Sequence, residues 1–302
     1  MIDAPSSTWF TASPHWHWLI VLYFVLGALA GGVYFLSAMI DLAGREGDRR
    51  LARMGYFMTL PLLAVIGVVL IVDLSRPDRF WHLFIENHTL QPMFKYWVPM
   101  SIGSWSVLLF SFIALLSSLA AFAEHRHPDW RFAPRLRPPG FLGALVVVFG
   151  AFFALVVTGY TGVMISVLNR PVWSDTALFG LLFIVSAVTM SAALMALSAR
   201  LLRWESPGVS ALDRIWVWLL IVQIPVLIAL FVSLGPAARG WLNVWGVVLA
   251  VGIALGIVLP LVAMLRRASL DESGLPYAAA MVLTGGVIMR AAIVFVPEVI
   301  AP

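Results

Sequence analysis

Long stretches almost free of charged residues recur along this chain, and they limit its fold more than any other feature. A helix needs roughly 20 apolar residues to cross the hydrocarbon core of a bilayer. Eight stretches of about that length or longer are centred on residues 19–40, 54–73, 97–122, 141–168, 176–199, 215–234, 241–265 and 276–297. Of the 302 residues, 62% are hydrophobic and 11% charged, so polar groups are too few to cover a water-soluble fold. A transmembrane barrel would instead show short alternating segments, and none is visible. We therefore predict an all-α, polytopic membrane protein with eight transmembrane helices, forming a single integral membrane domain over residues 1–302.

The basic residues lie mainly between alternate pairs of these stretches. Thirteen of the 19 lysines and arginines fall at 45–53, 126–137, 200–214 and 266–267, and five fall on the other face. By the positive-inside rule, the arginine-rich face is cytoplasmic. We therefore expect a multi-pass protein of the bacterial cytoplasmic (inner) membrane with both termini outside, in the periplasm. The first apolar stretch is too long for the core of a signal peptide, so no cleaved targeting segment is expected. The net charge of +4 comes from loops and does not indicate a nucleic-acid partner.

Several kinds of redox site are excluded by the residues that the chain lacks. It has no cysteine, so it cannot bind an iron–sulfur cluster through thiolates or perform thiol chemistry. None of its six histidines lies inside an apolar stretch, so paired haem ligands are absent. His15 with His17, or His125 with His127, could bind a metal in principle, but their spacing beside helices is more typical of interfacial or loop residues. We predict no metal site. Any electron carrier must therefore be exchangeable or belong to a partner.

Arg290 interrupts the last apolar stretch, seven residues before Pro297. At 1.5 Å per residue, it lies about 10 Å below the outer end of that helix. A mid-membrane arginine costs at least about 2.5–3.5 kcal/mol, so it needs a partner or a wet cavity. Arg290 either extends its charge to the interface or faces the helix bundle, where an acid or a polar ligand would pair with it.

Asp73 ends the second apolar stretch and is the acid nearest to Arg290 in depth. It could cap the chain's exit from the membrane or pair with Arg76 or Arg79, which follow in "DLSRPDRFWH". A partly desolvated carboxylate at a helix end also suits proton uptake and release. Both interpretations remain open from the sequence.

Two tyrosines are expected in the same outer layer. Tyr160 lies near the outer end of the fourth helix between Gly159 and Gly162, either as an interface anchor or beside space for a helix or a flat ligand. Tyr23 heads a stripe of small residues on the first helix that is typical of close packing. His17 lies just above them. Tyr23, Asp73, Tyr160 and Arg290 thus share one depth, which suggests a polar cavity.

Five segments together resemble one family, the NrfD/polysulfide reductase membrane subunits. They are "GALAGGVYFL", "DLSRPDRFWH", "GSW" at 103–105, "NRPVW" and "GGVIMRA", in the family's order and over nearly the whole chain. The count of eight helices is similar to the polysulfide-reductase type, which implies paired four-helix bundles.

The resemblance also implies a membrane anchor without haem or an iron–sulfur cluster of its own. Such an anchor exchanges electrons with a quinone, either menaquinone or ubiquinone. Its expected partners on the outer face are a four-cluster, ferredoxin-like iron–sulfur subunit and a molybdopterin catalytic subunit, with Arg76, Arg79 and Arg170 available for docking. Tyr160 corresponds to a tyrosine near the quinone headgroup. The family's helix-1 Asn and His are replaced here by Ile20 and Tyr23.

The leading hypothesis is a quinone-reactive subunit of a multisubunit oxidoreductase, coupled to proton transfer and inactive alone. Asp73 or His17 would accept protons, Tyr160 and Tyr23 would hold the headgroup oxygens, and Arg290 would stabilise negative charge. A secondary transporter is an alternative, with Gln223 as its best midplane group. A purely structural membrane anchor is another.

Overall fold

The computed structural model describes residues 16–126, 133–204, 206–266 and 274–300, and most of these form helices. The bounds are α1 Trp18–Ala43, α2 Arg49–Asp73, α3 Pro99–Arg126, α4 Phe141–Ser166, α5 Phe179–Leu201, α6 Pro207–Leu234, α7 Val244–Ile253, α8 Leu259–Leu265 and α9 Gly274–Ile300. A π-helical turn, Ala254–Val258, joins α7 to α8 within one continuous rod. Eight spans are long and apolar enough to cross a membrane, as predicted. The sixth span begins at Pro207, earlier than expected, because Ser206 caps the helix there.

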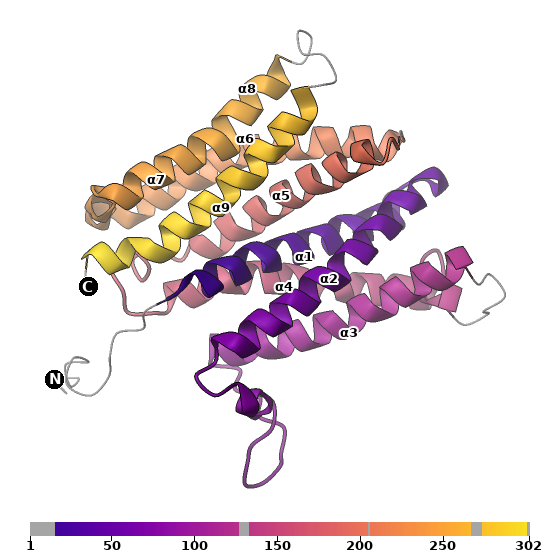
Figure 1. The fold of residues 1–302 in the computed structure, drawn as a ribbon, viewed down its shortest axis with the longest axis horizontal. Helices are drawn as coiled ribbons and strands as arrows, with labels where there is room; N and C mark the ends of the chain where they lie inside the picture. Colours follow the sequence, from indigo (N-terminus) through magenta and orange to yellow (C-terminus); the bar gives the residue numbers. More distant parts are fainter. Residues whose placement is uncertain (1–15, 127–132, 205, 267–273, 301–302) are drawn as a thin grey trace.

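The helices form two four-helix bundles that lie side by side (Figure 1). In the first bundle, α1 packs on α2 and α4, and α3 closes the ring between α2 and α4. In the second bundle, α5 packs on α6 and α9, and the α7–α8 rod packs on α9. Contacts of α1 and α4 with α5 join the two bundles, so α1 and α5 lie at the centre of the molecule. This arrangement confirms the paired bundles that the resemblance implied.

Small residues bring the helices together along this central contact, which we call the seam (Gly31, Gly32, Ala154, Ala187 and Ser191). A Cβ built on Gly32 of α1 would lie 2.7 Å from the carbonyl oxygen of Ala187 in α5, and one on Gly31 would lie 2.6 Å from the carbonyl oxygen of Ala154 in α4. Helices that approach so closely gain van der Waals contact along their backbones, which is the main attraction between helices in lipid. The seam therefore leaves no space for a larger side chain.

A buried ionic cluster closes the first bundle at the arginine-rich face. Arg137 is 1% exposed; its Nε and Nη2 donate to the Asp41 carboxylate at 3.0 and 2.6 Å, and its Nη1 donates to Glu124 at 2.5 Å. Burial disfavours the charged form of Arg137, but the hydrogen bond and ion pair with Asp41 outweigh it and raise the pKa of this guanidinium. Arg49 also pairs with Glu124, at 3.3 Å. The cluster therefore ties α1, α2 and α3 to the segment that leads into α4.

The opposite face carries the start of α1 and the ends of α2 and α9 (Figure 1). α2 ends at Asp73, and a short 3₁₀ helix, Pro77–Leu83, follows it in the outer loop. We call this the termini-bearing face. The candidate site lies in the half of the first bundle nearest to it.

Candidate functional site

The hydroxyl groups of Tyr23 and Tyr160 meet in a hydrogen bond between α1 and α4. Tyr23 is 1% exposed and Tyr160 is partly buried. The two residues are 137 positions apart in the chain, yet they form a direct pair inside the bundle. Both phenols can donate a proton, so the pair is an adaptable hydrogen-bonding group in an apolar setting.

Gly103 of α3 packs directly against the Tyr160 ring. A Cβ at this position would overlap the ring atoms Cε2 and Cζ, so only glycine lets the ring lie where it does. The glycines beside Tyr160 serve the neighbouring helix: Gly159 faces Ile184, and Gly162 faces the backbone of Phe179, both in α5. The space next to these two glycines is therefore filled by a helix rather than left for a flat ligand.

Asp73 is the last residue of α2 and is partly exposed. Arg79 pairs with Asp78 at 3.8 Å. Within the described ranges, no side chain forms an ion pair or hydrogen bond with the Asp73 carboxylate, so the alternative in which it pairs with Arg76 or Arg79 is not seen. The structure does not bring Asp73 into contact with the tyrosine pair.

His17 precedes α1, and its backbone carbonyl accepts a hydrogen bond from the Ile20 amide at 3.0 Å. Its side chain is exposed and lines a hollow of about 590 Å³ that also includes Trp18 of α1 and Phe295 of α9. This hollow lies between α1 and α9, whereas the tyrosine pair lies between α1 and α4. His17 therefore lies at the termini-bearing face, as expected, but beside α9 and not beside α4.

Arg290 is 1% exposed and faces the interior of the second bundle, so the interfacial alternative is wrong. Its Nη1 donates to the Ser186 hydroxyl at 3.0 Å and to the Gly286 carbonyl at 3.2 Å. The guanidinium also lies 5.2 Å from the centre of the Phe183 ring. Its Nε and Nη2 have no hydrogen-bond partner in the described part of the chain, and no described carboxylate pairs with it. A buried charge without a counter-charge is costly, so the Arg290 guanidinium lowers the stability of the folded protein.

Aromatic rings separate Arg290 from the tyrosine pair. Phe183 packs on Phe24 at 5.8 Å between ring centres, and Phe24 packs on Tyr23 at 5.6 Å. The structure thus brings Tyr23 and Tyr160 together and leaves Arg290, Asp73 and His17 outside direct contact with them.

Arg170 does not belong to the exposed docking surface that the sequence suggested. It is 4% exposed and pairs with Glu298 of α9 at 2.8 Å. This ion pair fastens the segment after α4 to the end of α9. Arg76 and Arg79 are exposed, as a docking surface requires.

A second polar layer lies deeper in the first bundle, and sequence reasoning missed it. The Tyr34 hydroxyl lies 2.8 Å from the Ser117 hydroxyl, and the Tyr34 and Tyr56 rings pack at 5.2 Å. Tyr34 shares the face of α1 that Tyr23 heads, so the spacing of the two tyrosines was the available signal. Polar groups therefore follow α1 from Tyr23 to Asp41.

Comparison with known proteins adds to this picture. The family model described as "Polysulphide reductase, NrfD" matches residues 10–300. A polysulfide reductase chain from Wolinella succinogenes is 23% identical over 273 residues, which cover 81% of the present chain and 84% of that protein. A selenate reductase subunit from Mesobacillus selenatarsenatis is 26% identical over 106 residues, which cover 35% of the present chain and only 22% of that protein. With nearly its whole length matched and two four-helix bundles built as the resemblance implied, the chain belongs to the NrfD polysulphide reductase family.

Proposed function

We propose that this chain is the quinone-reactive anchor of a multisubunit oxidoreductase and passes electrons between the membrane quinone pool and an iron–sulfur partner. Its family and the names of both relatives support the coarser role, a membrane subunit of a reductase-type complex. The observation that carries the finer role is the Tyr23–Tyr160 hydroxyl pair, since one of these tyrosines occupies the position that the resemblance links to the quinone headgroup.

The residues around the pair suit a quinone headgroup. A quinone has two carbonyl oxygens that accept hydrogen bonds, and Tyr160 and Tyr23 can each donate one. Gly103 fixes the Tyr160 ring, so its hydroxyl is pre-oriented. When bound, a quinone would take up two electrons and two protons, and a quinol would give them up. Tyr23 replaces the family's histidine, so this chain holds the headgroup through phenols instead of an imidazole.

We assign proton exchange with the termini-bearing face to Asp73 and His17. Asp73 is partly exposed at the end of α2 and makes no ion pair within the described residues, which leaves its carboxylate available to take up and release a proton. His17 is exposed at the start of α1. Neither touches the tyrosines. In this proposal, protons cross the remaining distance through water, or they are carried by the quinol as it moves.

Arg290 acts at a distance in this proposal. Its charge has no described counter-charge and lies in a low-dielectric interior, where a field extends further than in water. Across Phe183 and Phe24, that field favours negative charge near Tyr23. Arg290 is thus an electrostatic residue rather than one that binds the headgroup directly.

The expected partners are a four-cluster iron–sulfur subunit and a molybdopterin catalytic subunit at the termini-bearing face, which would lie in the periplasm. The exposed Arg76 supports such docking because no described residue forms an ion pair with it, whereas the exposed Arg79 already pairs with Asp78. The transporter alternative has less support: its best candidate, Gln223, is 3% exposed and donates to Thr189 at 2.8 Å, so it is already used within the protein.

Tyr160→Phe in the assembled complex tests the proposal. It removes one hydroxyl donor from a buried site, which should lower quinol-linked turnover by about 5- to 150-fold, the equivalent of about 1–3 kcal/mol. Electron transfer from the partner to a soluble dye should stay unchanged. Tyr277→Phe is the matched control, because that tyrosine is 72% exposed in α9. Normal quinol turnover in Tyr160→Phe would show that the pair does not hold the headgroup.

A further inference from the structure

A groove runs along α2 at the arginine-rich face and encloses about 640 Å³. The end of the groove at the membrane surface carries Arg50 and Arg53 of α2 and His125 of α3, and Trp204, which follows α5, forms one side. Positions 50, 53, 57 and 61 lie on one face of α2, so the groove follows the helix axis. We call this feature the α2 groove.

Within the described part of the protein, the charge of the two arginines in the α2 groove is only partly offset, by the attraction of Glu124 to Arg53. The Arg50 guanidinium stacks on the Trp204 ring at 3.9 Å from its centre, which fixes the charge at the mouth of the groove. Neither Arg50 nor Arg53 forms an ion pair or a side-chain hydrogen bond with any described residue. Glu124, the acid of the nearby ionic cluster, is engaged by Arg49 and Arg137.

The wall below these cations is apolar. Met54, Phe57 and Pro61 line it, and Phe57 is 38% exposed. Pro61 follows Arg50 by eleven positions, which is about 16 Å along the helix and enough for a large part of an acyl chain. The groove therefore combines a cationic mouth with a long apolar wall that runs towards the middle of the membrane.

We propose that the α2 groove binds an anionic phospholipid, with its phosphate between Arg50 and Arg53 and one acyl chain along Met54, Phe57 and Pro61. Basic pockets between transmembrane helices suit phosphate headgroups, and the aromatic side of the groove suits the level of the glycerol backbone. A free phosphate ion would match the charges equally well but would leave the apolar wall uncovered. A zwitterionic lipid would cover the wall but would bring its own cation to the two arginines.

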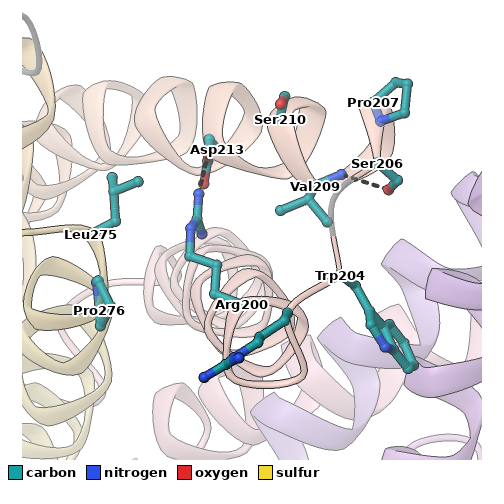
Figure 2. A pocket seen from close by; sticks show the side chains of 10 residues that line it. Arg200, Trp204, Ser206, Pro207, Val209, Ser210, Asp213, Leu275 and Pro276 are labelled. Carbon is teal, nitrogen blue, oxygen red and sulfur yellow. Dashed lines mark hydrogen bonds and ion pairs between the residues drawn. The ribbon is translucent and has the colours of Figure 1, made fainter. Parts of the chain in front are cut away.

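A neighbouring hollow of about 880 Å³ on the same face lacks a pair of arginines without ion pairs. In Figure 2, Arg200 of α5 points at Asp213 of α6, and the two form an ion pair. Ser206 caps the α6 helix by accepting a hydrogen bond from the Val209 amide. The Arg200 charge is thus already matched, which leaves Arg203 as the exposed cation of that hollow. Arg203 is therefore a suitable control for a general effect of arginines on this face.

The test is lipid retention by the full chain in detergent, measured by native mass spectrometry with phosphatidylglycerol, phosphatidylcholine and inorganic phosphate as probes. The wild type should retain phosphatidylglycerol in preference to phosphatidylcholine. The double variant Arg50→Gln/Arg53→Gln should weaken that binding about 25-fold, or roughly fivefold for each arginine. Arg203→Gln should bind like the wild type. Equal retention of both lipids, an unchanged double variant, or displacement of the lipid by inorganic phosphate would overturn the proposal.

A second measurement needs no variant and so does not depend on the folding of the double substitution. Phosphatidylglycerol with a photoreactive group in one acyl chain should label the wild-type protein at residues 54–61. Labelling spread evenly over all lipid-facing helices, or concentrated on another helix, would overturn the proposal.

Discussion

Replacing Gly103 with alanine should impair reaction with quinol while leaving the fold intact, because the added Cβ would occupy space that the Tyr160 ring fills. The ring lies directly over Gly103, and an ordinary van der Waals contact needs 3.4–4 Å. Restoring that contact moves the nearest ring atom by more than 1 Å, and a misplacement of about 1 Å can already lower a rate about 100-fold. The hydroxyl would then no longer meet that of Tyr23.

The cost to folding should be small by comparison. Overpacking a core position typically costs about 1–3 kcal/mol. Alanine in place of glycine inside a helix returns up to about 1 kcal/mol. The net loss of roughly 0–2 kcal/mol leaves a folded protein that assembles with its partner.

The assay compares quinol-linked turnover with partner-to-dye electron transfer in the same preparation. Gly67→Ala is the matched control, since a Cβ at Gly67 of α2 meets no atom within 4 Å. We expect Gly103→Ala to lose most quinol turnover and to retain dye reduction, whereas Gly67→Ala retains both. Equal quinol turnover in the two variants would refute the argument that the position of the Tyr160 ring matters.

Other predictions concern charged groups. Asp73→Asn should slow quinol-linked turnover without changing dye reduction, and an unchanged rate would remove Asp73 from the proton route. Asp41→Asn removes one of the two carboxylates that pair with the buried Arg137; because Glu124 remains, the cost should stay below the about 3–5 kcal/mol of a fully unpaired buried charge, but the unfolding temperature in detergent should still fall clearly, and a shift as small as that of the exposed Arg76→Gln would contradict this. Arg290→Met removes an uncompensated buried charge, so the unfolding temperature should hold or rise while quinol turnover falls; a less stable protein would show that Arg290 has a counter-charge. Hydrogen bonds from the Thr89 hydroxyl, and then from the Thr89 and His88 amides, lower the pKa of Glu86. These bonds therefore order the loop at 86–91 above the pKa that Glu86 has in the unfolded chain, and they are lost as the pH falls through its pKa in the folded protein. Amide hydrogen exchange in this loop, corrected for intrinsic rate, should accelerate only at acidic pH.

The helices were predictable because a bilayer fixes their length, and uninterrupted apolar stretches are easy to count. Depth was predictable for the same reason: Tyr23 and Tyr160 were expected in one layer, and their hydroxyls meet. Depth does not give the direction that a side chain takes around its helix axis. Arg290 was expected in that same layer, yet it faces α5 within the second bundle and meets Ser186 instead.

The ionic cluster was not predictable by counting apolar stretches. Counting stops at the first charge, so Asp41 was treated as the edge of the first helix, although α1 continues to Ala43. Its partner Arg137 is 96 residues away and was counted only as a loop charge. A single acid near the end of a helix, next to a face rich in arginines, indicates such an ion pair, but it does not identify the arginine that forms the pair.

The seam limits how the two bundles can move relative to each other. Gly32 brings α1 of the first bundle so close to α5 of the second that rocking of one half past the other would break backbone contact, and Gly31 fixes α1 against α4 within the first bundle. A protein locked along its midline does not offer its interior first to one side of the membrane and then to the other. Under the proposed function, the quinone is then expected to enter sideways, between helices, from the surrounding lipid.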